Sequence, residues 1–412
     1  MQDRACRPMG KVLPMRAAAL PPARPRWQDR RMSTMITPLE EGSGALAVAV
    51  KDLIDWTGTP TTAGSRAVAL GARPAATDAA CLAGLRSAVE AGSARMVGKA
   101  NLHELAAGAT GVNPWFGTPA NPLDRRLVPG GSSSGSAVAV ATGEADVALG
   151  TDTAGSVRIP SACCGTVGLK TTWGRVPLRG VWPLAPSLDT VGPMARNVAG
   201  VVAGMALLEP GFEVAVEPPV RIGRVRLAGT DPRLDSALDA ALSATGAEIA
   251  EVALAGWARA GDATLTVVLA EAWVADRHLL ADPEGIDPRI VSMLGLGARL
   301  DPSELTYALV ELDGWRRELA RAVERAGGVI ALPTLLGPPP RLEDPDDGRL
   351  LLATAPVNGA GFPALALPVP CAGAPGGVGS LQLVAGPGGE ELLCAAGSLL
   401  EAAAASLGTA RR

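Results

Sequence analysis

Short apolar runs alternate with amphipathic helical patterns along most of this chain, and this alternation is what most restricts its fold. The predicted strands cover residues 46–50, 95–98, 221–227 and 247–254. The predicted helices cover residues 78–90, 232–244, 302–326 and 390–405, the first two with Asp78 and Asp231 as capping residues. Strands and helices in such alternation predict a β-sheet covered by helices.

Composition excludes several classes of protein. The chain has 412 residues, 48% of them hydrophobic, so it can bury a large core and is neither disordered nor fibrous. Residues 1–31 hold eight basic and two acidic residues, whereas the whole chain has a net charge of −4. We therefore expect residues 1–34 to be a disordered basic tail or a wrongly assigned start. The acidic remainder argues against nucleic acid as a partner.

From the sequence we expect no membrane partner and no metal centre. Its apolar runs are too short, or too interrupted by Gly and Pro, to span a bilayer. No secretory signal is recognisable in residues 1–31. Two histidines, and six cysteines without CxxC spacing, leave little for a metal centre and favour a reduced, cytoplasmic setting.

Lysine is rare in this chain, since the 37 basic residues include only Lys11, Lys51, Lys99 and Lys170. A position that needs only positive charge can drift to arginine, but a group that must lose its proton cannot, because guanidinium stays charged. Lys51 directly follows the apolar run at residues 46–50, where burial lowers the pKa of an amine and lets it act as a base.

The segment PGGSSSGS at residues 129–136 is the least ordinary part of the sequence. Three interpretations remain open: a phosphate-binding loop, a flexible linker or a serine-based catalytic loop. The Gly-Lys-Ser/Thr exit of a phosphate loop is missing, and a linker is an unexpected neighbour for the apolar helix predicted after it. A serine nucleophile needs a base, and because His103 and His278 lie in helical settings, Lys51 is the alternative.

A second serine ends a turn of small residues. The segment ALGTDTAGSVRIP at residues 148–160 leads from a predicted strand into this turn, whose backbone N–H groups can point into one concavity and bind an oxyanion. Ser156 stands at its end. An ordinary turn is the alternative interpretation.

Together these motifs resemble the amidase signature family. The matching segments are AVKD (49–52), GGSSSGS (130–136), GTDTAGSVRIP (150–160), GLK (168–170), SLDTVGP (187–193) and NGAGFPA (358–364). The resemblance covers most of the chain from about residue 40. It implies a single large α/β domain with a mixed central β-sheet covered by helices on both faces.

Members of that family hydrolyse amides with a Ser-Ser-Lys triad, so the resemblance implies a role for each matching residue. Ser156 matches the nucleophile, Ser132 the serine that relays its proton, and Lys51 the base. Ser132 would follow a cis peptide bond from Gly131. The oxyanion would meet the backbone N–H groups of Thr153, Ala154, Gly155 and Ser156.

Other polar residues near these motifs are expected to support the site. Ser133 is interpreted as a structural helper of Ser132. Asp152 and Arg158 are interpreted as a pair that braces the catalytic turn. We expect Lys99 to form a salt bridge at a strand end and Lys170 to bind backbone carbonyls.

The expected function is hydrolysis of a small or medium carboxamide without a cofactor, and the resemblance is compatible with a homodimer. The alternatives are an inactive amidase-like binding protein and a glutaminase-type amidotransferase subunit. The predicted domain covers residues 35–412. Its expected parts are a signature core (35–210), a substrate-shaping region (211–335) and a C-terminal return to the core (336–412). A rigid, proline-rich loop is predicted at residues 333–347.

Overall fold

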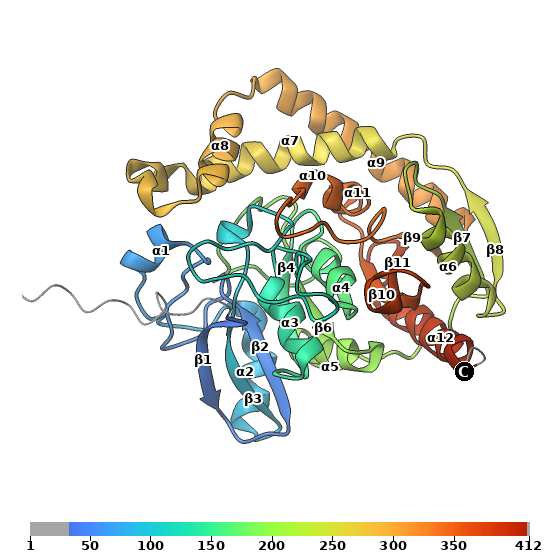
Figure 1. Ribbon diagram of the computed structural model, residues 1–412, viewed down its shortest axis with the longest axis horizontal. Helices are drawn as coiled ribbons and strands as arrows, with labels where there is room; N and C mark the ends of the chain where they lie inside the picture. Colours follow the sequence, from blue (N-terminus) through green and yellow to red (C-terminus); the bar gives the residue numbers. More distant parts are fainter. Residues whose placement is uncertain (1–32, 410–412) are drawn as a thin grey trace, which may run out of the picture.

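The computed structural model describes residues 33–409, in which eleven strands form one mixed β-sheet (Figure 1). The strand order is β1-β3-β2-β4-β6-β5-β10-β11-β9-β7-β8. The strands are β1 (Met35–Glu41), β2 (Leu46–Lys51), β3 (Ala94–Ala100), β4 (Val147–Asp152), β5 (Val167–Lys170), β6 (Thr190–Ala195), β7 (Arg221–Val225), β8 (Glu248–Val252), β9 (Val329–Pro333), β10 (Ala364–Pro370) and β11 (Val378–Ala385). The expectations for residues 1–32, including Lys11, lie outside the described residues.

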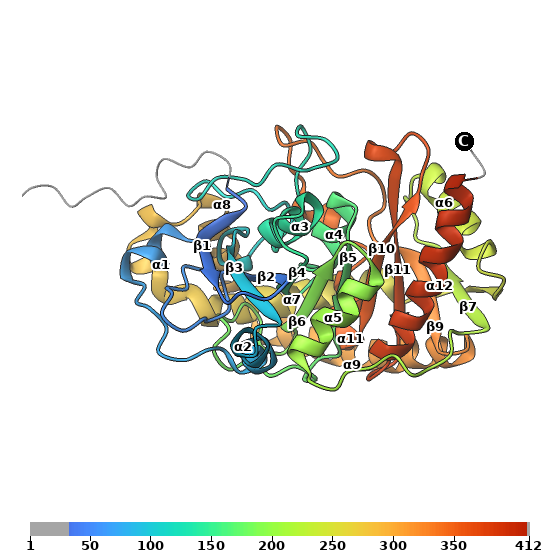
Figure 2. The ribbon, with the colours of Figure 1, turned by 90° about the horizontal axis from the view of Figure 1, so that it is seen from below.

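Helices cover both faces of this sheet, which confirms the predicted fold class. They are α1 (Arg66–Gly71), α2 (Ala83–Glu90), α3 (Ser134–Thr142), α4 (Arg158–Cys164), α5 (Val198–Leu208), α6 (Pro232–Ser243), α7 (Trp257–Asp276), α8 (Pro288–Gly297), α9 (Pro302–Arg325), α10 (Asp347–Leu351), α11 (Ala355–Ala360) and α12 (Glu390–Thr409). One face is covered by α2, α5 and α12, which pack in that order (Figure 2), and the other carries α3 and α4.

Alternating side chains along β2 explain why a core lies on each side of the sheet. Val48 and Val50 belong to the core shared with α2 and α5, whereas Ala49 faces the opposite core, shared with α3. Lys51 has the same parity as Ala49, so its side chain lies on the α3 side. Because β2 runs parallel to β4, with Val50 opposite Leu149, the carboxyl ends of these two strands meet at one edge.

The other predicted elements lie close to their expected places. The strands predicted at residues 221–227 and 247–254 are β7 and β8, each somewhat shorter than expected. The helix predicted at residues 232–244 is α6, and Asp231 caps it by accepting a hydrogen bond from the backbone N–H of Arg233 at 2.9 Å.

The predicted start of the helix at residues 78–90 is wrong. A short 3-10 turn (Ala80–Leu82) comes first, and α2 begins directly after it at Ala83 instead of at residue 78. Asp78 does not cap this helix, because its carboxylate accepts hydrogen bonds from Thr57 and forms an ion pair with Arg86. The local pattern assigns Asp78 to the helix cap, but its side chain binds residues of the tertiary structure instead.

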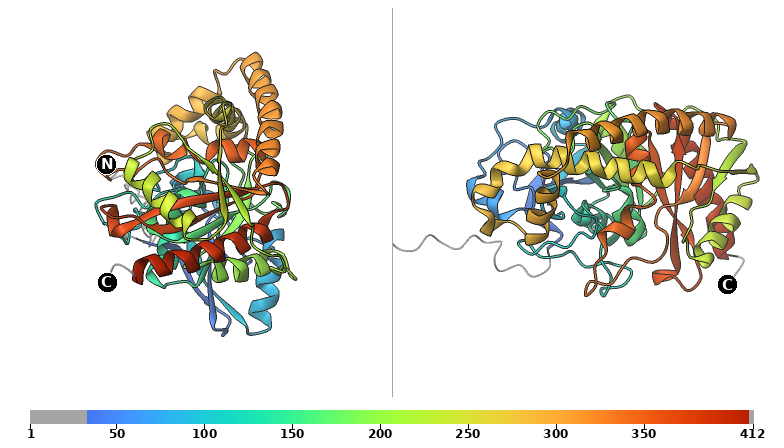
Figure 3. Two further views of the ribbon diagram at one scale, coloured as in Figure 1. Left: turned by 90° about the vertical axis from the view of Figure 1, so that its right-hand side faces the viewer. Right: turned by 90° about the horizontal axis from the view of Figure 1, so that it is seen from above.

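The helices α7, α8 and α9 form a further layer on the α3 side of the sheet (Figure 3). In this layer α7 packs against α8 and α9, and it also contacts α11. Within residues 33–409, none of the helices combines the length and apolar character needed to cross a membrane. Strands from all three predicted segments share the one sheet, and the boundaries at residues 210 and 335 stay predictions.

Candidate active site

Lys51 ends β2 with its amine completely buried. Its Nζ donates hydrogen bonds to Oγ of Ser132 and to Oγ1 of Thr151, both at 2.7 Å. Burial lowers the pKa of Lys51 to about 7, although the negative charges of Asp152 and Asp189 act in the opposite direction. The amine can therefore exchange a proton near neutral pH.

The glycine-serine loop is packed into the protein, so the linker interpretation is wrong. The peptide bond between Gly131 and Ser132 is cis, and Ser132 is fully buried. Its carbonyl accepts a hydrogen bond from the backbone N–H of His103 at 3.0 Å. Ser133 donates from its N–H to the carbonyl of Ser156 at 3.2 Å, which joins this loop to the second serine motif.

Contacts from outside the segment hold the turn that carries Ser156. Thr153 donates its hydroxyl hydrogen to Oδ1 of Asp189 at 2.6 Å, and the hydroxyl of Thr354 donates to the carbonyl of Ala154 at 2.7 Å. At Gly155 the backbone has φ +142°, and a Cβ there would lie 2.3 Å from Oγ1 of Thr354. This position therefore requires glycine.

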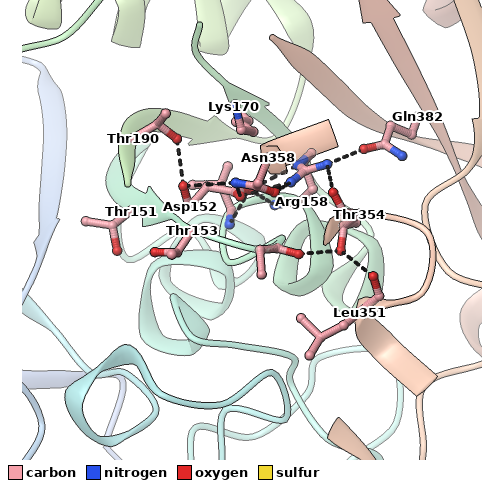
Figure 4. Close-up of polar contacts among 12 residues, drawn as sticks. Thr151, Asp152, Thr153, Arg158, Lys170, Thr190, Leu351, Thr354, Asn358 and Gln382 are labelled. Atoms are coloured by element: carbon pink, nitrogen blue, oxygen red, sulfur yellow. Dashed lines mark hydrogen bonds and ion pairs between the residues drawn. The ribbon is translucent and has the colours of Figure 1, made fainter. Parts of the chain in front are cut away.

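Asp152 and Arg158 form a buried ion pair behind this turn, with 2.9 Å between Oδ1 and Nη2 (Figure 4). The other carboxylate oxygen of Asp152 accepts from the backbone N–H of Val157 at 3.1 Å. Despite burial, the Arg158 charge and its hydrogen bonds hold the pKa of Asp152 well below its usual range. Arg158 also donates to Asn358 and Gln382, so the pair ties the turn to the C-terminal segment.

The two other interior lysines have the contacts expected of them. Nζ of Lys99 lies 2.9 Å from Oδ1 of Asp52, and both side chains are buried. Asp52 is thereby paired away from Lys51. Lys170 donates to the backbone carbonyl of Phe362 at 2.8 Å.

A cavity of about 290 Å³ opens beside the turn. Thr153, Ala154 and Ser156 line it at one side. The apolar part of its wall includes Leu265, Val268 and Leu269 of α7 and Ile290 and Met293 of α8.

The cavity wall also contains three charged or titratable side chains from separate segments of the chain, which are His103, Arg289 and Asp347. Burial lowers the pKa of His103. Arg289 donates from Nη2 to Asp287 at 2.6 Å. Asp347 accepts a hydrogen bond from the backbone N–H of Thr110 at 2.9 Å. Among residues 33–409, no cluster of His, Cys, Asp and Glu side chains is arranged to hold a metal ion.

Comparison with known proteins gives one consistent family. A model of the Amidase family matches residues 43–210. The chain is 35% identical to 2-amino-5-chloromuconic acid deaminase of Comamonas testosteroni, over 79% of this chain and 74% of that protein. It is 34% identical to a glutamyl-tRNA(Gln) amidotransferase subunit of Halobacterium salinarum, over 86% of this chain and 94% of that protein. A crystal structure of an amidase superposes with a TM-score of 0.79 and 32% identity, covering 88% of this chain and 85% of that chain.

The chain belongs to the amidase signature family. It is a hydrolase of carbon–nitrogen bonds in amides, as this family membership implies. In this amidase Lys51 contacts Ser132, and the loop that contains Ser132 contacts Ser156 through Ser133.

Reasoning from sequence misses several residues of the candidate site, namely Asp189, Arg289, Asp347 and Thr354. It considers His103 only as a base. Arg289 carries no local signal, because arginine is the common cation of this chain. Asp347 lies at the end of the predicted proline-rich loop. Asp189 alone has a usable signal, since it lies inside the segment SLDTVGP that resembles the family.

Proposed function

We propose that this amidase hydrolyses a small or medium carboxamide to the carboxylic acid and ammonia or an amine. Ser156 forms the acyl-enzyme, Lys51 is the base and Ser132 relays the proton between them. The observation that carries the proposal is the buried amine of Lys51 at 2.7 Å from Oγ of Ser132. With a pKa of about 7, much of this amine is neutral near neutral pH, and its lone pair can accept a proton.

In the acylation step, neutral Lys51 takes the proton of the Ser132 hydroxyl, and Ser132 takes that of Ser156. The Ser156 oxygen attacks the amide carbonyl carbon and forms a tetrahedral intermediate. When the intermediate collapses, the carbon–nitrogen bond breaks, and the proton returns through Ser132 to the leaving nitrogen. Water then attacks the ester by the same route and releases the acid and the free serine.

The negative charge of the tetrahedral intermediate would be held by backbone N–H groups of the turn, from Thr153, Ala154, Gly155 and Ser156. One donor of this kind contributes about 3 kcal/mol to the stability of the transition state. Support comes from the rigidity of the turn, since Asp189, Thr354 and Asp152 each bind it. Donors held in place before the reaction need no reorganisation during it.

The cavity favours an acyl group of moderate size with a polar end. Its volume of about 290 Å³ suits a small ligand, and α7 and α8 supply apolar contacts. Arg289 and Asp347 offer one cationic and one anionic side chain. We therefore propose that the substrate carries a polar or charged group away from its amide.

A glutaminase-type amidotransferase subunit is the second candidate. It is favoured by the similarity to the Halobacterium salinarum protein, which extends over 94% of that protein. Such a subunit would depend on partner chains, whereas a free amidase would not. A catalytically inactive binding protein is the third candidate, with less support because all three triad positions are occupied.

One experiment separates these candidates. Purified full-length chain is assayed alone against aliphatic, aromatic and amino-acid amides, glutamine included, and is labelled with a fluorophosphonate serine probe. We expect turnover of at least one simple amide and probe attached to Ser156. Turnover of glutamine only after partner chains are added would favour the amidotransferase, and inertness toward both amides and the probe would favour the binding protein.

A further inference from the structure

Beside the turn that carries Ser156 lies a buried carboxylate that takes no part in the proton transfers described above. Asp189 precedes β6 and is 6% exposed. It accepts the hydrogen bond of the Thr153 hydroxyl at 2.6 Å, and it accepts further hydrogen bonds from the backbone N–H groups of Leu184 at 3.0 Å and Ala185 at 3.1 Å. All of these partners are uncharged.

Burial against neutral partners raises the pKa of Asp189, because the charged form loses its hydration. A carboxylate in such a place lowers stability unless its hydrogen bonds offset the loss. Because Asp189 binds Thr153, its position indicates a role in holding the turn that carries Ser156.

The first effect of Asp189 is geometric. Thr153 begins the turn that ends at Ser156, and the bond to Asp189 fixes the rotamer of its side chain. On the other side of Gly155, Val157 is bound by Asp152. The turn is therefore held at both ends, and Asp189 supplies the hold at the Thr153 end.

The second effect is electrostatic. The negative charge of Asp189 acts on the amine of Lys51 together with that of Asp152, and both favour the protonated amine. The charged or titratable groups that face Lys51 are Asp152, Asp189 and His103, and those that face Asp189 are Lys51, Glu271 and Asp276.

We infer that Asp189 is a positioning residue of this amidase, which acts through Thr153 on the turn that carries Ser156. The inference rests on the proposed reaction of Ser156, Ser132 and Lys51. The segment SLDTVGP, which contains Asp189, would thus support the reaction without being part of the triad.

The test compares three variants of the full chain with the wild type, using the best amide from the panel and measuring kcat and KM from pH 5 to pH 10. Asp189→Asn removes the charge and keeps the shape. Thr153→Val removes the hydroxyl and leaves the charge. Asp313→Asn removes an exposed carboxylate on α9 and serves as the control.

We expect both Asp189→Asn and Thr153→Val to lower kcat by about 10- to 100-fold, because the turn is displaced, with a smaller change in KM. Only Asp189→Asn should also move the pH at which kcat/KM rises to a lower value, because the negative charge of Asp189 favours the protonated amine of Lys51. The control should leave both quantities at their wild-type values.

The inference is overturned if Asp189→Asn folds and retains both the wild-type kcat and the wild-type pH profile of kcat/KM. If Asp189→Asn does not fold, a wild-type kcat in Thr153→Val overturns it instead. Lys51→Ala, measured alongside, separates failure of the proposed reaction from failure of the role of Asp189. Activity in Lys51→Ala would reject the proposed reaction. If Lys51→Ala is inactive and Asp189→Asn is unchanged, only the role of Asp189 is rejected.

Discussion

The amine of Lys51 lies 2.7 Å from the hydroxyl of Ser132, although 81 positions separate the two residues along the chain. The end of β2 supplies one group, and the loop before α3 supplies the other. Neither group is exposed to solvent. The loss of hydration that lowers the pKa of Lys51 is therefore a direct result of where β2 ends.

Replacing Lys51, the proposed base, tests this contact. We expect Lys51→Ala to lower kcat/KM for amides by about four orders of magnitude or more, because the proton of the nucleophile then has no acceptor. Lys51→Arg should be equally inactive, since guanidinium cannot become neutral. Thermal unfolding of both variants checks that the fold is retained, and near-normal hydrolysis by either variant would contradict the assignment.

The two neighbouring serines should differ in their effect. Ser132→Ala removes the hydroxyl that contacts Lys51, so we expect it to reduce kcat far more than Ser133→Ala does. Ser133 uses its backbone N–H to bind the carbonyl of Ser156, and alanine keeps that bond. Equal losses in the two variants, measured at saturating amide, would show that the relay is wrongly assigned.

The pH dependence follows from the state of Lys51. The base must be neutral, and its pKa is lowered to about 7, so kcat/KM should rise with pH through about 7 and then level off. An unburied lysine would place the same rise above pH 10. Initial rates in constant-ionic-strength buffers measure the position of the rise, and a profile that falls across pH 6 to 8 would exclude neutral Lys51 as the base.

Substrate preference should depend on Arg289. Replacing it by Met keeps much of the side-chain length and removes the charge that lines the cavity. We expect Arg289→Met to raise KM for amides with an anionic group and to leave KM for uncharged amides nearly unchanged, because only the former gain from a guanidinium. If KM for both classes rises equally, Arg289 shapes the pocket without reading charge.

The buried pair of Asp152 and Arg158, which holds the turn that carries Ser156, should also contribute to the stability of the fold. Arg158→Met leaves the Asp152 carboxylate buried without its cation, which costs about 3–5 kcal/mol in the free energy of unfolding. Arg317→Met is the matched control, because it breaks an exposed ion pair with Asp313. Urea unfolding compares the two, and equal midpoints would show that the buried pair contributes no more than the exposed one.

The sheet around the site is predictable from local pattern. The apolar run at residues 46–50 predicts β2. Since side chains alternate along a strand, Lys51 shares the side of Ala49, and the structure places the serine loop on that side. The helix start at residues 78–90 is not predictable in this way, because the carboxylate of Asp78 binds Thr57 and Arg86, which come from other segments.

The walls of the site are harder to predict than its proposed reacting groups. Lys51 stands out because lysine is rare in this chain, and Ser132 and Ser156 lie in segments rich in small residues. Their proposed roles come from the resemblance to the amidase signature family. Arg289 and Asp347 lie in ordinary ones, and only the packing of α7 and α8 over the turn brings Arg289 to the cavity. Such contacts depend on tertiary geometry, for which a single sequence holds no periodic signal.

The proposed reacting groups lie within residues 51–156, whereas most of the large apolar side chains in the cavity wall belong to α7 and α8, which pack together as part of a separate layer. Selection can therefore alter what is accepted without altering how the bond is broken. We expect recombination that exchanges residues 257–297 between relatives to change the range of amides while the chemical step is kept, so this layer is the natural place to begin in diversifying the enzyme.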